Sequence, residues 1–259
     1  MHPAMFHTAA PGMIEAENLV MRYPTGRLAL SGATLTIAPG DLVAVLGHNG
    51  SGKSTMLRCI AGLLRPTAGA VRVAGEELTR LTGRKLADAR MALGMIFQHG
   101  HLVRRRSVIA NVLCGTLGRH RGVATSLGAL PWSEADFAEQ CLDAVGLASL
   151  ARQRADTLSG GQAQRVAIAR ALAQRPQAML ADEPVASLDP EAAEEIMRLL
   201  RGLASNEGLP VVCVLHQPEL ARRYADRILG LRQGRTVFLD DAETVTPQQI
   251  ASLYEGNAP

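Results

Sequence analysis

Near its amino terminus the chain reads Leu42-Val43-Ala44-Val45-Leu46-Gly47-His48-Asn49-Gly50-Ser51-Gly52-Lys53-Ser54-Thr55. The apolar run at 42–46 stops at a glycine, which is typical of a strand buried on both faces. Residues 53–64 carry helical spacing, and we expect that helix to end at Arg65-Pro66. The stretch therefore predicts a strand, a glycine-rich loop and a helix in direct succession.

The loop from Gly47 to Thr55 matches the pattern G-x-x-x-x-G-K-[ST], and we expect all of its residues to contact a nucleotide. Its glycines allow backbone N–H groups to point inward at phosphate oxygens, and the helix behind the loop directs its dipole at the same anion. Lys53 supplies a positive charge for the β- and γ-phosphates, and the Ser54 hydroxyl is a ligand for Mg²⁺. The alternative is a glycine- and serine-rich surface turn, but the strand and helix on either side favour a phosphate-binding loop.

Strands and helices alternate along most of the remaining chain. Further strands are predicted at 71–73, 94–97, 178–181 and 211–215, with two more between 227 and 239 around Gln233-Gly234. Helices are predicted at 190–204 and 218–225. This alternation indicates an α/β fold with a mostly parallel, doubly wound sheet. Residues 105–170 are almost wholly helical and interrupt the alternation, so we interpret them as an inserted helical subdomain.

Polar side chains follow the predicted buried strands. Asp182 and Glu183 close the run at 178–181, Gln98 closes 94–97, and His216 closes 211–215. Ligands of open α/β sheets bind at this edge. We expect Asp182 to hold Mg²⁺ through water and Glu183 to polarise an attacking water. Gln98 is a candidate to ligate Mg²⁺ and orient water, and His216 to hydrogen-bond a γ-phosphate. The alternative for each residue is a purely structural role.

A second anion-binding turn is predicted at Leu158-Ser159-Gly160-Gly161-Gln162. Ser159 is placed to cap a helix, and the two glycines allow close backbone approach. One loop is enough to hold one nucleotide, so two such turns predict nucleotides shared between two copies of the chain. An ordinary capped helix is the alternative. Tyr23, before Pro24, is a candidate to stack on adenine, and the alternative is a buried strand tyrosine.

Composition narrows the class of protein. The chain has 27 Lys and Arg against 24 Asp and Glu, a net charge of +3, and this balance argues against a dedicated nucleic-acid binder. No charge-free apolar stretch of about 18 residues occurs, so we expect no transmembrane helix. Residues 1–12 do not have the pattern of a secretory signal, and we expect a flexible tail there. The four cysteines form no CxxC pair, which favours reduced cytosolic thiols.

With these motifs, the chain resembles the nucleotide-binding subunits of ABC transporters over about residues 14–240. The family's motifs occur in family order: Tyr23 as A-loop, Gly47–Thr55 as Walker A, Gln98 as Q-loop, Leu158–Gln162 as signature, Met179–Glu183 as Walker B, Ser187-Leu188-Asp189 as D-loop and His216 as switch histidine. The resemblance implies a P-loop NTPase (RecA-like) core with a mostly parallel sheet, an N-terminal antiparallel β element and a helical subdomain at about 99–170. The ATPase domain would span 13–246, followed by a short C-terminal helix and tail at 247–259.

The resemblance also implies partners and a mechanism. It implies a head-to-tail dimer that binds ATP and Mg²⁺, with each ATP between Walker A of one subunit and the signature of the other. ATP binding would close the dimer, and hydrolysis would open it and drive transmembrane permease subunits. The permease would dock near Arg104-Arg105-Arg106. A solute-binding protein would be an indirect partner, and the subunit would lie peripherally on the cytoplasmic face of the cell membrane.

A narrower resemblance is to the phosphonate-import ATPases. It rests on Gly94-Met95-Ile96-Phe97-Gln98, on Ala181-Asp182-Glu183-Pro184-Val185-Ala186-Ser187-Leu188-Asp189 and on Leu215-His216-Gln217. It implies phosphonates or related phosphorus oxyanions as cargo. The chain departs from the family pattern at His48 and at His99-Gly100-His101. Alternatives are an ABC ATPase for another cargo, such as an amino acid or a lipoprotein, and an ABC ATPase without a transport role. An inactive scaffold conflicts with Lys53, Asp182 and Glu183.

Overall fold

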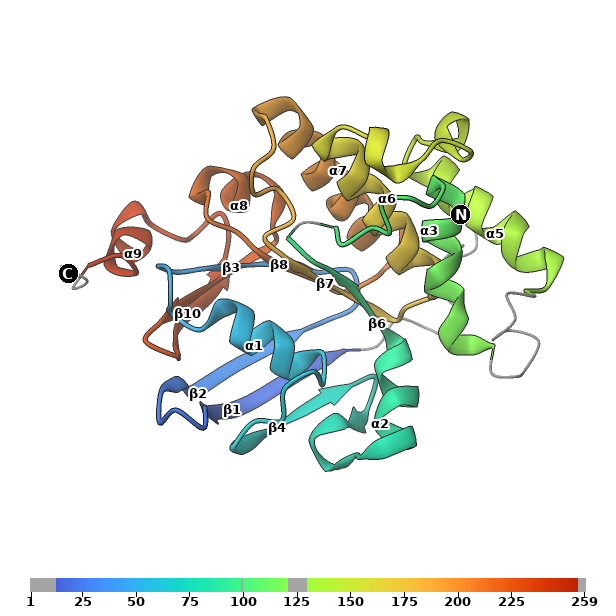
Figure 1. Cartoon of the computed structure of the whole chain (residues 1–259). Helices are drawn as coiled ribbons and strands as arrows, with labels where there is room; N and C mark the ends of the chain where they lie inside the picture. Colours follow the sequence, from blue (N-terminus) through green and yellow to red (C-terminus); the bar gives the residue numbers. More distant parts are fainter. Residues whose placement is uncertain (1–12, 99, 121–129, 256–259) are drawn as a thin grey trace.

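The computed structural model describes residues 13–98, 100–120 and 130–255. Its centre is a six-stranded sheet in the order β10-β9-β3-β8-β7-β6, parallel except for the β9–β10 pair (Figure 1). These strands are β3 (Leu42–Leu46), β6 (Leu93–Ile96), β7 (Ala178–Asp182), β8 (Val211–Val214), β9 (Arg227–Arg232) and β10 (Arg235–Asp241). The mostly parallel sheet predicted from the sequence is confirmed.

A second sheet holds the N-terminal strands. It is antiparallel, in the order β2-β1-β4-β5, and consists of β1 (Ile14–Arg22), β2 (Leu28–Ile37), β4 (Ala68–Val73) and β5 (Glu76–Glu77). The expected N-terminal antiparallel element is therefore present. The predicted half-exposed strand at 71–73 is also present, because Val71 and Val73 are buried while Arg72 is not. The expected tail at 1–12 lies outside the described residues.

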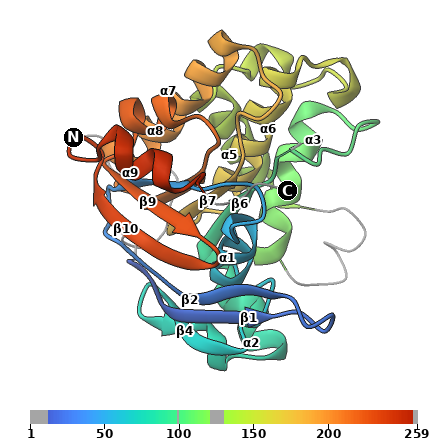
Figure 2. The ribbon, with the colours of Figure 1, turned by 90° about the vertical axis from the view of Figure 1, so that its left-hand side faces the viewer.

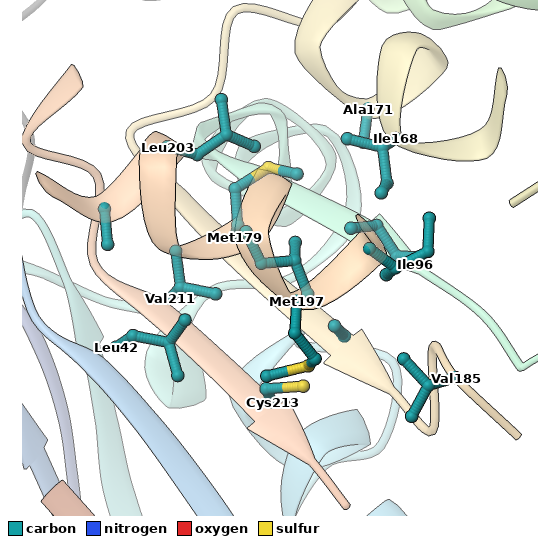
Figure 3. Close-up of a cluster of buried hydrophobic side chains, with 14 of the residues drawn as sticks. Leu42, Ile96, Ile168, Ala171, Met179, Val185, Met197, Leu203, Val211 and Cys213 are labelled. Carbon is teal, nitrogen blue, oxygen red and sulfur yellow. The ribbon is translucent and has the colours of Figure 1, made fainter. Parts of the chain in front are cut away.

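Strand β3 is buried on both faces because its side chains alternate between two hydrophobic clusters. Val43 and Val45 pack with Met56 and Leu57 of helix α1 (Lys53–Ile60), on the side of the second sheet. Leu42, Ala44 and Leu46 face the opposite side. There helices α6 (Gly160–Ala173) and α7 (Pro190–Glu207) cover the sheet, and Figure 3 shows Ile168 and Met197 meeting its side chains. The continuous apolar run is thus required by a sheet with both faces covered.

Two helix ends differ from the sequence-based expectation. Helix α1 ends at Ile60, well before Arg65-Pro66, because Gly62 adopts a left-handed conformation with φ +64° and its N–H bonds to the Cys59 carbonyl at 3.0 Å. Glycine at this point of a helix end stops the helix whatever the periodicity beyond it. Helix α7 runs past the predicted end at 204 as far as Glu207, where Gly208 makes the same kind of cap at φ +73°.

The predicted helical insertion forms a group of helices at one side of the molecule. Helices α3 (Val108–Leu113), α5 (Trp132–Ala144) and α6 pack on one another (Figures 1 and 2). Short 3₁₀ helices at Cys114–Arg119, Ala148–Leu150 and Ala155–Thr157 connect them. The remaining helices are α2 (Gly83–Ala89), α8 (Pro218–Tyr224) and α9 (Pro247–Ser252), with 3₁₀ turns at Leu78–Arg80 and Arg90–Ala92.

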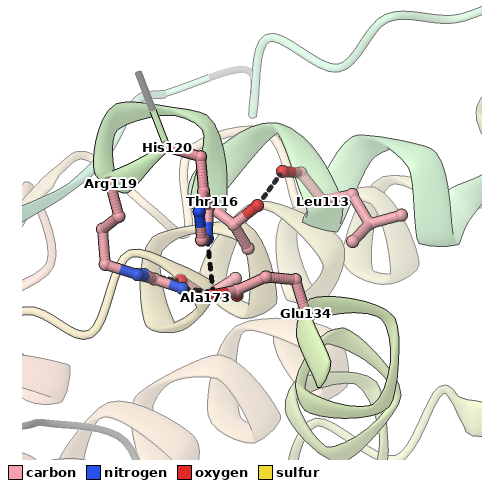
Figure 4. Close-up of polar contacts among 6 residues, drawn as sticks. All are labelled: Leu113, Thr116, Arg119, His120, Glu134 and Ala173. Carbon is pink, nitrogen blue, oxygen red and sulfur yellow. Dashed lines mark hydrogen bonds and ion pairs between the residues drawn. The ribbon is translucent and has the colours of Figure 1, made fainter. Parts of the chain in front are cut away.

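A buried carboxylate ties this helical group together. Glu134 of α5, only 5% exposed, accepts hydrogen bonds from Arg119 at 2.6 Å and pairs with His120 at 2.7 Å (Figure 4). Arg119 also donates to the carbonyl of Ala173, at the end of α6. Burial disfavours the charged carboxylate, but the hydrogen bond from His120 and the charge of Arg119 outweigh it and lower the pKa of Glu134. The acid therefore joins three helical segments as an anion.

Within the described residues, no helix is both long enough and apolar enough to cross a membrane. The four cysteines carry free thiols, as expected, and burial raises the pKa of Cys59 to about 11 and of Cys141 to about 12. These two thiols pack as core side chains.

Candidate functional site

The glycine-rich loop at 47–55 connects β3 to α1 and is shaped by close backbone approach. A Cβ atom at Gly47 would lie 2.2 Å from the carbonyl oxygen of Leu231, and one at Gly52 would lie 2.6 Å from that of Ala29. Gly52 also has φ +110°, a left-handed conformation, just before α1 begins. No larger residue fits at either position, so the loop conformation is fixed by its glycines.

Lys53 is buried inside the loop that precedes it. Its side chain is 5% exposed, and its Nζ donates to the carbonyls of Gly47 at 2.8 Å and His48 at 3.0 Å. Burial lowers the pKa of Lys53, while the nearby charges of Glu183 and Asp182 raise it and oppose that effect. The ammonium group is thus held at the centre of the loop, facing two carboxylates.

The loop also holds a polar atom without a partner. The Oγ of Ser51 is buried and makes no hydrogen bond to any described residue. Buried hydroxyls in folded proteins are almost always hydrogen-bonded. A phosphate oxygen would accept the Ser51 proton, so the residues present fit a nucleotide phosphate.

Ser54 and Asp182 meet at the edge of the sheet. The Ser54 hydroxyl donates to Oδ1 of Asp182 at 2.9 Å, although the two residues are far apart in sequence. Asp182 is 6% exposed, and burial raises its pKa while the bond from Ser54 opposes that rise. A hydroxyl and a carboxylate side by side are hard oxygen donors, the type that Mg²⁺ prefers. This pair fits the magnesium site expected from the sequence.

The residue after Asp182 turns in another direction and meets the histidine that follows β8. Glu183 has φ +53°, which takes its side chain away from that of Asp182. Its Oε1 lies 2.6 Å from Nε2 of His216. Strands β7 and β8 run in parallel with Asp182 opposite Val214, so both residues emerge at the same edge. The structure thereby brings together two of the three predicted catalytic residues.

Gln98 lies at that edge but takes no part in the two pairs, Ser54 with Asp182 and Glu183 with His216. Strand β6 pairs with β7 in parallel, Ile96 opposite Ala181, and Gln98 is exposed in the turn that follows. Within the part of the chain that the structure describes, its side chain has no hydrogen bond to Ser54 or Asp182. Its predicted role at the metal stays a prediction.

Tyr23 lies one residue beyond β1, half-buried, and so is not the buried strand tyrosine of the alternative interpretation. Its hydroxyl is 3.2 Å from Oγ1 of Thr55, the last residue of the loop. The aromatic ring is therefore fixed beside the glycine-rich loop, in a position consistent with an adenine contact.

The signature turn caps helix α6. The Ser159 hydroxyl accepts from the N–H of Gln162 at 3.2 Å, and the Gln162 side chain accepts from the N–H of Ser159 at 3.0 Å, which is a complete capping box. The predicted capping role of Ser159 is confirmed by these bonds. The helix N-terminus at this turn is exposed, as an anion site for a second molecule requires.

The predicted D-loop packs against the signature. Leu188 lies 3.2 Å from where a Cβ of Gly160 would be, so that glycine allows the contact. Asp189 caps α7 through the N–H of Ala192 at 2.9 Å. The two motifs line a shared pocket of about 280 Å³ formed by Ser159, Gly160, Gly161, Gln162, Arg165, Ser187, Leu188, Asp189, Glu191, Ala192 and Glu195. No residue of the glycine-rich loop is among them, so the loop and the signature turn lie at separate places on one chain.

Two contacts from the C-terminal part of the chain to the loop were not expected from the sequence. The N–H of Gly234 donates to the Ser51 carbonyl at 2.8 Å. The hydroxyl of Tyr254, which follows α9, lies near the backbone of Gly47: burial raises the pKa of Tyr254, and the Gly47 backbone opposes that rise. Neither contact has a local sequence signal, because each depends on how distant segments fold together.

Comparison with known proteins agrees with this site. The family described as "ABC transporter" matches residues 30–186. A phosphonates import ATP-binding protein of Synechococcus is 46% identical over 93% of this chain and 90% of its own length. Another, of Frankia casuarinae, is 49% identical over 88% of this chain and 90% of its own length. A dimeric bacterial ABC transporter cassette has a TM-score of 0.78 at 35% identity, covering 88% of this chain and 98% of its own.

A second solved structure of high similarity is a dimeric cassette in a post-hydrolysis state bound to ADP and phosphate. Its TM-score is 0.78 at 34% identity, over 88% of this chain and 98% of its own. The matched region spans the glycine-rich loop, the signature turn and the carboxylates at the end of β7. The chain belongs to the ABC transporter family and is one of its ATP-binding, ATP-hydrolysing subunits.

Proposed function

We propose that this chain energises the import of phosphonates, or of related phosphorus oxyanions, across the cytoplasmic membrane. The proposal is carried by one observation: relatives in several bacteria that match most of the chain at 42–49% identity are named phosphonates import ATP-binding proteins. The subunit would act peripherally on the cytoplasmic face with transmembrane permease subunits. A solute-binding protein would deliver the cargo.

Two copies would share two ATP molecules. The separation of the glycine-rich loop from the signature pocket within one chain supports this arrangement. Tyr23 and Gly47–Thr55 of one copy would bind ATP on one side, and Leu158–Gln162 with the D-loop (Ser187–Asp189) of the other would complete the site. The exposed N-terminus of α6 would then face a γ-phosphate.

Hydrolysis would use the side chains at the edge of the sheet. Glu183 would accept a proton from the water that attacks the γ-phosphorus, and His216 would hold the carboxylate or the phosphate by hydrogen bonding. Ser54, Asp182 and Gln98 would hold Mg²⁺, which when bound neutralises phosphate charge. Lys53 would contact the β- and γ-phosphates from within the loop.

The chain would divide into a RecA-like core and a helical subdomain at about 99–170. The surface between these two parts would contact the permease. A groove of about 560 Å³ lies between the two parts and is lined by Ala61, Leu63, Ala87, Arg90, Met91, Leu93, Met95, Phe97, His101, Cys114, Gly115, Arg170, Ala171 and Gln174. Arg104, Arg105 and Arg106 are exposed nearby in sequence but do not line it. The permease would seat in this groove and close to the three arginines, which follow Gln98 in the chain.

The cargo is tested by uptake. Deleting the gene in its host should abolish uptake of a radiolabelled alkylphosphonate, and a plasmid copy of the wild type should restore it while a Glu183→Gln copy does not. Amino-acid uptake measured in parallel is the control. Unchanged phosphonate uptake in the deletion strain would contradict the proposed cargo, and loss of amino-acid uptake instead would assign a different one.

A further inference from the structure

The turn between β1 and β2 presents an arginine beside the glycine-rich loop. The turn is held by hydrogen bonds from the N–H of Tyr23 to the Arg27 carbonyl and from the N–H of Gly26 to the Tyr23 carbonyl, both at 2.9 Å. Arg22 adds a bond from its guanidinium to the carbonyl of Gly26 at 3.1 Å. The backbone of Arg27 is therefore fixed relative to Tyr23, the candidate adenine contact.

The side chain of Arg27 reaches the loop itself. Its terminal Nη2 lies 3.7 Å from the position that a Cβ of Gly50 would occupy. Tyr23, on the same turn, contacts Thr55 at the other end of the loop. The turn thus places two side chains beside the glycine-rich loop, the Tyr23 hydroxyl at its last residue and the Arg27 guanidinium near its middle.

Arg27 makes no ion pair or side-chain hydrogen bond to any residue in the described ranges 13–98, 100–120 and 130–255. Other arginines on the same sheet are satisfied: Arg22 binds the Gly26 carbonyl, and Arg72 pairs with Glu17 at 3.1 Å. An exposed cation with no acidic partner, carried on a hydrogen-bonded turn beside a loop that fits phosphate, is suited to bind an anion. A guanidinium offers five N–H donors in a planar fork that matches phosphate oxygens.

We infer that Arg27 is a further phosphate-binding residue, a second cation for the nucleotide beside Lys53. The two cations differ in setting. Lys53 is buried and already donates to two carbonyls, with two carboxylates near it. Arg27 is exposed and has all of its donors free for the nucleotide. This inference rests on the proposed ATP site, which it extends by a residue outside every motif of the family.

The inference is tested with nucleotides that carry different numbers of phosphate groups. Replacing Arg27 by Gln keeps much of the stem and removes the charge. Dissociation constants of wild type, Arg27→Gln and Arg27→Lys are measured for ATP, ADP and AMP by titration calorimetry, with kcat and KM of the ATPase reaction. Arg84→Ala is the matched control, since Arg84 is an exposed arginine on α2 and its loss changes the net charge equally.

Arg27→Gln should weaken ATP binding about two- to tenfold, which is the range for an exposed ion pair that includes a hydrogen bond to a charged group. The loss should be smaller for ADP and absent for AMP. It should appear in KM with little change in kcat, and it should shrink at high salt because the guanidinium is exposed. Arg27→Lys should recover part of the affinity, and Arg84→Ala should match wild type.

Equal affinity of Arg27→Gln and Arg84→Ala for ATP would overturn the inference. An equal loss for ATP, ADP and AMP would also overturn it, because the contact would then be to the nucleoside or the α-phosphate, which all three share, and not to the phosphates that Lys53 is proposed to bind. Failure of the proposed site itself looks different: wild type would not bind ATP, or Lys53→Ala would bind it normally.

Discussion

At the scale of single residues, the polar side chains of the candidate site lie where the parallel strands end. Glu183 meets His216 at 2.6 Å, and Ser54 meets Asp182 at 2.9 Å, although the partners come from distant segments. These side chains were predictable because residues that follow buried parallel strands share one edge of the sheet. Tyr254 and Arg27 were not, since their contacts with the loop depend on tertiary packing that leaves no local pattern.

Lys53→Ala tests the loop at this scale. The substitution removes the ammonium group that the loop surrounds, so ATP binding should fall below detection in titration with a fluorescent ATP analogue. The free energy of unfolding should change far less than the free energy of ATP binding. The side chain donates hydrogen bonds to the carbonyls of Gly47 and His48 but belongs to neither hydrophobic cluster. Retained nucleotide affinity would show that the loop does not bind phosphate.

At the scale of elements, the strands were more predictable than the helix ends. An apolar run such as 42–46 can only be buried, and β3 covers that same range. Helix ends depend on single residues with left-handed backbone, and Gly62 and Gly208 override the periodicity around them. The three-dimensional arrangement of the helical group also needed the structure, because its internal links, such as Glu134 with Arg119, join separate segments.

Glu134→Gln tests the link between the helices. Arg119 would lose its anion in a buried site, and we expect unfolding at neutral pH to become easier by about 1–3 kcal/mol. The folded-state pKa of Glu134 is lowered, so its contribution is fully present above the unfolded pKa of about 4.3 and is lost as pH falls through the folded pKa. Urea unfolding should therefore show a gap between wild type and variant that narrows on acidification. A gap that widens towards acid pH would contradict this account.

Ser159→Ala tests whether the cap of α6 also serves the partner's nucleotide. Ser107 is a matched control, because its hydroxyl caps α3 in the same way, accepting from the N–H of Ala110 at 3.3 Å. Each substitution should cost about 1 kcal/mol of stability in thermal or urea unfolding. Only Ser159→Ala should weaken ATP-dependent dimerisation in sedimentation experiments. Equal effects of both variants on dimerisation would show that Ser159 only caps α6 and has no further role in binding the partner's nucleotide.

At the scale of the whole molecule, a single chain keeps the glycine-rich loop apart from the signature pocket. The loop at 47–55 surrounds Lys53 and carries Ser54, which bonds to Asp182, and none of its residues lines the signature pocket. The signature pocket has an exposed helix N-terminus but no lysine of the loop. Solved cassettes with TM-scores of 0.78 are dimers. Association of two copies would complete both sites at once, which links ATP binding to closure of the dimer.

Shared nucleotide sites are tested most directly by the molar mass of Glu183→Gln, measured by light scattering after size exclusion, with and without ATP and Mg²⁺. The substitution keeps the shape of the side chain and removes the base, so bound ATP should persist and hold two copies together. We expect a dimer with ATP and a monomer without nucleotide. A monomer under both conditions would contradict the shared sites.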